Sequence, residues 1–172
     1  LKWDFNLTGV KYIEYIFTNC QKYGGIIDFS NQDLGRGGIS SLCNIISNCT
    51  NLIGLNFANA NGSLISSILP LWGSGMWDAN SDRRPLKPFN GEANSFINMS
   101  NFNGSNISNM FYAFAYCNVC HINAANFNGT RVNNMGSLCN GDSWLISINL
   151  SNFGATLNQN TGSASRMFSE CK

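Results

Sequence analysis

One short motif in the sequence has the spelling of a haem attachment site. Cys117 and Cys120 are separated by two residues and followed directly by His121, which is the CxxCH pattern that binds c-type haem. His121 is the only histidine in the chain, so the second axial ligand would have to be a methionine or be missing. Because Cys117 also belongs to a repeated pattern, we expect no haem. An extracellular c-type haem protein is therefore the third of three hypotheses.

A single histidine also limits the reactions that the chain could catalyse. A Ser-His-Asp triad needs a histidine as its proton carrier, and zinc sites are commonly built from several histidines or from pairs of CxxC motifs. The chain has one histidine and no pair of CxxC motifs. The sequence therefore predicts no enzyme and no metal site.

Asparagine is frequent, and eight of the 28 asparagines begin an Asn-x-Ser/Thr sequon for N-glycosylation. Three sequons have glycine in the middle, and Asn-Gly is typical of an exposed turn. Glycans at such turns would form a ladder along one edge of the molecule. The alternative is that Asn-Gly serves the turn alone. The predicted glycosylation sites are Asn61, Asn103 and Asn128, followed by Asn106, Asn6 and Asn48.

The seven cysteines indicate an oxidising compartment, because they do not form metal-binding pairs. Cys20 and Cys49 occupy equivalent positions in a repeated pattern, so they form a candidate disulfide. We expect Cys139 to pair with Cys117 or Cys120, and Cys171 to be a free or intermolecular thiol. The alternative is a column of buried free thiols, since reduced cysteine packs well in a core.

A short phrase recurs along the chain and predicts the strands. Each copy consists of an apolar residue, then Asn or Asp, then a second residue that is usually apolar. This alternation is typical of a strand of three to five residues. The polar anchors are separated by 24, 28, 42, 25 and 26 residues. They are Asp4, Asp28, Asn56, Asn98, Asn123 and Asn149.

A second pattern has helical spacing and lies between the phrases. Apolar residues recur at every third or fourth position in 10–20, 39–49, 65–75, 107–117 and 164–171, which predicts an amphipathic helix of about three turns. Strand and helix then alternate within units of about 25 residues that must stack to bury their apolar faces. We expect an α/β solenoid of about six coils, incomplete at both ends. It forms a single domain over 1–172, with an inserted loop at about 73–94.

The phrase resembles a leucine-rich repeat. Leu52, Leu55 and Phe57 have its strand spacing, as do Leu145, Ile148 and Leu150. With the Phe-x-x-Cys ending of the helical pattern, the sequence is most similar to the BspA-like leucine-rich repeats of microbial surface proteins. The resemblance implies a secreted or surface-displayed protein of adhesion or interaction, and it implies no catalytic residues.

The composition limits the possible partners. Charged residues make up 11% of the chain and the net charge is +1, which excludes a phosphate-binding basic surface. No apolar run is long enough to span a membrane, and the chain starts at Leu1 without a signal-like leader. We therefore expect an extracellular or cell-surface protein whose export signal has been removed or lies outside this sequence.

The leading hypothesis is a structural protein that self-assembles. The chain opens on a strand phrase and stops after a helical pattern, so one copy is expected to complete the coil of the next, head to tail. The product would be a glycosylated filament. The alternative is a cell-surface adhesin or ligand-binding repeat module that binds carbohydrate or another surface ligand through its sheet or through the 73–94 insert.

Overall fold

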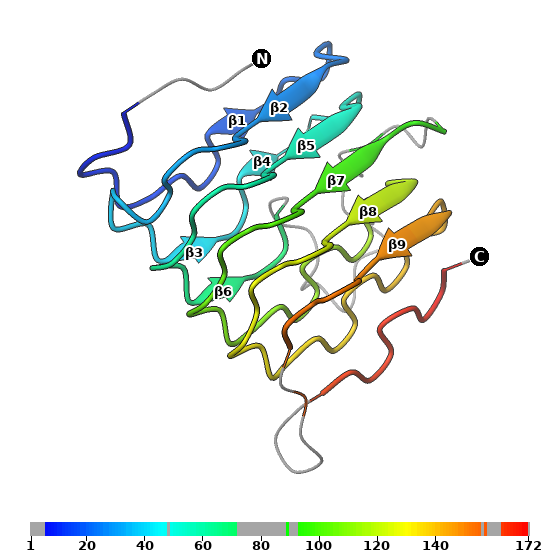
Figure 1. Ribbon diagram of the computed structural model, residues 1–172. Helices are drawn as coiled ribbons and strands as arrows, with labels where there is room; N and C mark the ends of the chain where they lie inside the picture. The colour runs from blue at the N-terminus through cyan, green and yellow to red at the C-terminus, as the bar shows by residue number, and fades with distance from the viewer. Residues whose placement is uncertain are drawn as a thin grey trace, which may run out of the picture.

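The computed structural model describes residues 6–47, 49–71, 89, 93–155, 157 and 163–171. Within these residues the chain winds into a β-solenoid of about four turns (Figure 1). All strand pairs are parallel. The strands are β1 (Phe17–Thr18), β2 (Ile26–Asp28), β3 (Ser41–Leu42), β4 (Ile46–Ser47), β5 (Gly54–Asn56), β6 (Ser67–Ile68), β7 (Phe96–Asn98), β8 (His121–Asn123) and β9 (Ser147–Asn149).

The largest sheet is built from the repeated phrases. Its strand order is β2-β5-β7-β8-β9, and two smaller sheets pair β1 with β4 and β3 with β6. The predicted alignment of the phrases is confirmed, because their central apolar residues are direct Cα partners in neighbouring strands. These partners are Ile27, Leu55, Ile97, Ile122 and Ile148.

A column of phenylalanines runs through the core. Phe29 and Phe57 stack with centroids 5.0 Å apart, and Phe102 and Phe127 stack at 5.5 Å. Between the two pairs the rings meet edge to face, because the phenylalanine moves from the first to the fourth position after the anchor. Where phenylalanine is at one of these two positions, a smaller residue can occupy the other: Ala60 is at the fourth position beside Phe57, and Ala124 is at the first position beside Phe127. The core volume is thus kept from coil to coil.

The predicted helices are wrong. The described parts of 10–20, 39–49, 65–75, 107–117 and 164–171 are turns and two-residue strands, so the fold is not an α/β solenoid with alternating helices. In 107–117 the N–H groups of Met110 and Phe114 donate to Asn134 and Leu138 of the next coil, both at 2.8 Å. Between them, Ala113 donates three residues back to Met110, which is a turn bond rather than the four-residue bond of an α-helix. Tyr112 has φ 59°, a left-handed conformation that interrupts an α-helix.

The apolar spacing misled the helix prediction for a geometric reason. The chain turns every few residues, and buried side chains recur about three residues apart, as Ile107, Met110 and Ala113 do. This produces apolar residues three apart, which is also the spacing of a helical stripe.

The expected number of coils also changes. The described chain makes about four turns rather than six. The expected first phrase around Asp4 lies outside the described residues, as does all of the 73–94 insert except residues 89, 93 and 94. Phe89 is buried and forms a bridge with Leu52.

Candidate functional site

Aligned asparagines on the outer face of the large sheet form the centre of the candidate site. In each coil the anchor Oδ1 accepts a hydrogen bond from the N–H two residues later, at 2.9–3.1 Å. This bond is an Asx turn, and it holds the side chain in one orientation. We call this set the outer row: Asp28, Asn56, Asn98, Asn123 and Asn149.

Two further rows of asparagine are closed ladders, in which each amide bonds the amide or carboxylate of a neighbouring coil. The turn row is Asn31, Asn59, Asn101, Asn126 and Asn152, and the sequon row is Asp33, Asn61, Asn103 and Asn128. Every residue of the turn row has a φ of 54–61°, which asparagine tolerates better than most residues. Nδ2 donates to the Oδ1 of the preceding coil at 2.9–3.4 Å in the turn row and at 2.9–3.3 Å in the sequon row.

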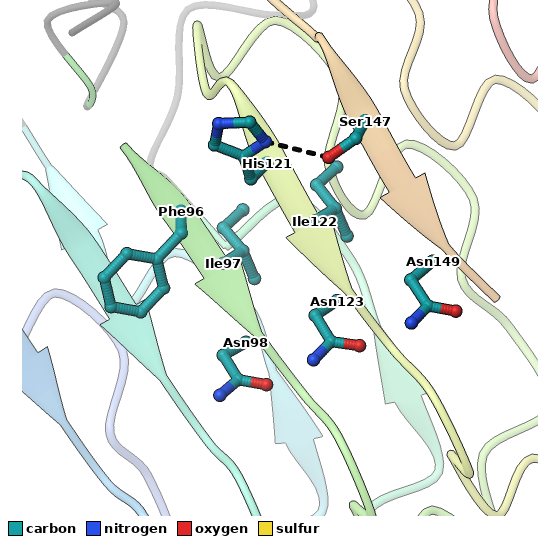
Figure 2. A pocket seen from close by; sticks show the side chains of 8 residues that line it. All are labelled: Phe96, Ile97, Asn98, His121, Ile122, Asn123, Ser147 and Asn149. Atoms are coloured by element: carbon teal, nitrogen blue, oxygen red, sulfur yellow. Dashed lines mark hydrogen bonds between the residues drawn. The ribbon is translucent and has the colours of Figure 1, made fainter. Parts of the chain in front are cut away.

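The outer row differs because most of its amide donors remain open. Asn56 Nδ2 donates to Asp28 Oδ1 at 3.0 Å. Within the described chain, no hydrogen bond uses the Nδ2 atoms of Asn98, Asn123 and Asn149. These three amides lie parallel to one another, each with its nitrogen toward the preceding strand and its oxygen toward the next strand (Figure 2). Each of their Oδ1 atoms accepts one Asx-turn bond, and their Nδ2 atoms are unused, so this part of the face offers three donors to a ligand.

The amides line a shallow depression of about 370 Å³ on β7, β8 and β9. Its floor is formed by Ile97 and Ile122, which are buried. None of its lining residues is Asp, Glu, Lys or Arg. Its surface is therefore without formal charge when His121 is neutral.

Phe96 forms a flat apolar platform at the edge of this depression. Phe96 and Gly54 are Cα partners on neighbouring strands, and a Cβ at Gly54 would lie 2.5 Å from the Phe96 ring. The ring therefore lies over Gly54, and only glycine leaves room for it. In Figure 2 it points away from His121, across the neighbouring strand. One face of the ring packs on the sheet, while the residue remains half-buried.

His121 is held in place by hydrogen bonds at both ring nitrogens. Nδ1 lies 2.8 Å from Ser147 Oγ, and Nε2 lies 2.9 Å from the Ala93 carbonyl oxygen (Figure 2 shows the first contact). A carbonyl oxygen only accepts, so Nε2 carries a proton. In the neutral ring, Nδ1 then accepts from the Ser147 hydroxyl. The imidazole therefore has a fixed plane beside the outer row.

The predicted glycosylation sites occupy different environments. Asn61 and Asn103 are half-buried in the sequon row, whereas Asn128 is exposed at its end, although its Nδ2 also donates to the row. Asn6 is exposed, and Asn106 Nδ2 donates to the Ser63 carbonyl. An N-glycan at Asn61 or Asn103 would compete with the ladder for Nδ2. Asn48 lies outside the described residues, and glycosylation at all six sites stays a prediction.

The two cysteines proposed as a pair near the N-terminal end are neighbours. Phe17 and Thr18 pair in register with Ile46 and Ser47, which places Cys20 beside Cys49 in the next coil. Both are thiols in this structure. Burial raises the pKa of Cys49, and the nearby Cys20 thiol raises it further. The disulfide stays a prediction that this proximity permits.

Three of the remaining predicted cysteines lie around a buried carboxylate that the sequence analysis missed, whereas the N–H of Cys120 bonds Ser95 Oγ. Cys117 and Cys139 are buried, and Cys171 is partly buried. Burial raises the pKa of each of these thiols, and the Asp142 carboxylate raises each of them further. Cys171 Sγ donates to the Cys139 carbonyl oxygen at 3.0 Å. All seven cysteines are thiols in this structure, so the role of Cys171 as a free or intermolecular thiol stays a prediction.

The CxxCH motif is divided between the two sides of the sheet. Cys117 and Cys120 are buried, while His121 lies on the outer face. The Cys117 thiol also donates to Asp142 Oδ2. Thioether bonds from these thiols to a haem would require this coil to open.

Phe96 and Ser147 are site residues that sequence reasoning did not select. Phe96 and Ser147 stand two positions before the anchors Asn98 and Asn149. Gly54 and His121 occupy the same position in β5 and β8. A strand's period of two would have placed them on the outer face. Their chemistry changes from coil to coil, so a search for repeated residues passes over them.

Within the residues that the structure describes, no group of three or more His, Cys, Asp or Glu side chains is placed to hold a metal ion. The same residues contain no helix that is long and apolar enough to cross a membrane. The fold defines the class of the protein as a β-solenoid. Comparison of the chain with protein-family models, curated proteins and solved structures gives no match.

Proposed function

We propose that the protein is a non-catalytic binding module that holds an extended ligand on the outer face of its large sheet. The observation that carries this proposal is the set of open Nδ2 donors of Asn98, Asn123 and Asn149. The turn row and the sequon row use their donors internally. Asn109 and Asn134 also make Asx turns, and no hydrogen bond within the described residues uses their Nδ2 atoms. The outer row is distinguished by three neighbouring open donors that line one depression.

The donors are arranged before any ligand binds. Each Oδ1 is fixed by its Asx turn, so the amide does not lose much rotational freedom on binding. Neighbouring parallel strands are about 4.8 Å apart, and the donors repeat along the solenoid axis at that interval. A ligand with acceptor groups at a similar repeat would bind several donors together, which increases its overall affinity.

The expected location supports the same proposal. The low charge, the sequons and the resemblance to BspA-like repeats favour a surface-displayed interaction protein. Extracellular placement and membership of that family are proposed on these grounds alone.

The test removes the donors while keeping the Asx turns. In the double variant Asn98→Asp/Asn123→Asp, a carboxylate replaces each amide, and Asp28 already makes the same turn at 2.9 Å. The charge-matched control is Ser100→Asp/Ala125→Asp, which adds two carboxylates to the same coils without removing an amide. Both are run in affinity gels containing hydroxyethyl cellulose, hyaluronan or a polar unfolded polypeptide.

We expect at least one polymer to retard the wild-type protein and the control. The donor variant should bind it about 10-fold more weakly, as the loss of two hydrogen bonds implies. Failure of all three polymers to retard the wild type contradicts the proposal. Equal binding by the donor variant contradicts it too.

A further inference from the structure

The chemistry of the outer face indicates which class of ligand it binds. We infer that it binds a neutral linear polysaccharide, which lies across β7, β8 and β9 with one sugar ring on Phe96. This inference rests on the proposed function and names the ligand class for the same site. It is carried by three properties of the depression: its donors, its lack of charge and its aromatic platform.

The open amides select for ligands that are rich in acceptors. Asn98, Asn123 and Asn149 each present an unused Nδ2 donor, while each Oδ1 accepts the backbone N–H of its own Asx turn. Hydroxyl and ring oxygens of a sugar chain accept such bonds. The strand spacing of about 4.8 Å is close to the length of one sugar unit in an extended chain. Successive sugars can therefore meet successive asparagines.

The absence of charge selects against acidic polymers. No Lys or Arg lines the depression, and none of its residues is acidic. An anionic ligand would lose hydration there without gaining an ion pair. A neutral polymer loses less, because neutral hydroxyls exchange hydrogen bonds with water for hydrogen bonds with the amides.

Phe96 supplies the apolar contact that a sugar ring needs. The face of an aromatic ring carries partial negative charge, which attracts the partly positive C–H groups on one side of a pyranose. Gly54 keeps the Phe96 ring flat on the sheet, so its outward face is available for such a contact. His121 is fixed by Ser147 and Ala93 and lies on the adjoining strand, where it limits the path that the polysaccharide can take across the face.

An extended peptide fits this site less well. Peptides that add to a sheet bond the backbone at its edge, whereas the open groups here are side chains on the face. The donors also lie along a line that crosses the strands. A polypeptide is therefore the competing outcome of the experiment rather than the inferred ligand.

The experiment measures binding of hydroxyethyl cellulose by affinity gel electrophoresis. Phe96→Ala removes the platform, Phe96→Tyr keeps a ring, and Gly54→Ala displaces the ring through its new methyl group. We expect Phe96→Ala to weaken binding about 5-fold or more and Phe96→Tyr to retain it. Gly54→Ala should weaken binding although the aromatic side chain is still present. Urea unfolding midpoints show that each variant compared is folded.

The outcomes separate this inference from the proposed function. Binding of hydroxyethyl cellulose that weakens in both Phe96→Ala and Asn98→Asp/Asn123→Asp supports both. Binding of only hyaluronan or the polypeptide, weakened by the Asn98→Asp/Asn123→Asp variant, overturns the polysaccharide inference and leaves the binding module standing. Unchanged hydroxyethyl cellulose binding in Phe96→Ala also overturns the inference. No binding of any polymer overturns both.

Discussion

The carboxylate of Asp142 accepts a hydrogen bond from the thiol of Cys117, with Oδ2 and Sγ 2.9 Å apart in the core. Backbone bonds from Tyr116 to Asn140 and from Gly141 to Ser169 place Asp142 in the same column as Cys117 and Cys171. Asp142 therefore stands where other coils carry cysteine. Backbone N–H groups of Val119 and Trp144 also donate to its carboxylate, at 3.3 and 3.4 Å.

This arrangement predicts that the protein loses stability in alkaline solution. Burial and the nearby carboxylate raise the pKa values of Cys117 and Cys139, so the folded state keeps both thiols protonated above about pH 9. The unfolded chain releases these protons first. The free energy of unfolding should then fall with pH, by up to about 1.4 kcal/mol per pH unit for each of these buried thiols.

Urea unfolding under reducing conditions at several pH values between about 8 and 10 measures this effect. Cys139→Ala removes one of the two thiols and should make the fall less steep. A midpoint that is independent of pH over this interval would show that these thiols do not titrate differently in the two states.

The turn row predicts a large effect from a small surface change. Asn101 has φ 55°, and its amide joins Asn59 to Asn126. Asn101→Ala loses two hydrogen bonds and replaces asparagine by alanine, which tolerates a left-handed conformation less well. It should cost about 2–4 kcal/mol. Asn101→Gly loses the same bonds but tolerates the conformation, so it should cost about 1 kcal/mol less.

The exposed Asn133 is the matched control for the turn row. Asn133 contributes its backbone N–H to a bond with Ser108, so Asn133→Ala should change the free energy of unfolding by less than about 0.5 kcal/mol. Chemical denaturation of the three variants tests the order. If Asn101→Ala were as stable as Asn133→Ala, the ladder would not be a source of stability.

The neighbouring thiols of Cys20 and Cys49 predict a disulfide that forms without rearrangement. Oxidation by a disulfide reagent such as oxidised glutathione joins the two sulfurs, and the reagent takes up the two electrons and protons as thiols. The bond should stabilise the protein by about 3–4 kcal/mol for a loop of this length. Peptide mapping without reduction identifies the linked pair, and Cys20→Ser is the control. A map that links either residue to another partner would contradict the register.

Head-to-tail assembly stays a prediction from the sequence. With a net charge of +1, little repulsion opposes the close approach of two copies. Sedimentation velocity should therefore show a mass that rises with protein concentration. A single monomeric species at every concentration would contradict assembly and would leave the binding proposal untouched.

The glycan ladder illustrates how far sequence reasoning could go. The Asn-Gly sequons were predicted to align, and Asn61, Asn103 and Asn128 do align in successive coils. The sequence did not reveal that their Nδ2 atoms bond the neighbouring coil. Such a bond depends on a partner 25 to 42 residues away, and its geometry appears only after the coils stack.

The alternation of apolar and polar residues around Ile27, Leu55 and Ile97 by itself determined the parallel stack. A shift of one residue would have turned these side chains from the core to the solvent. The tertiary structure decided the path between the strands, because turns and helices share the same three-residue apolar spacing. It also decided which asparagines keep a free donor. That outcome depends on whether the neighbouring coil places an acceptor within hydrogen-bonding distance, as it does for Asn101 but not for Asn123.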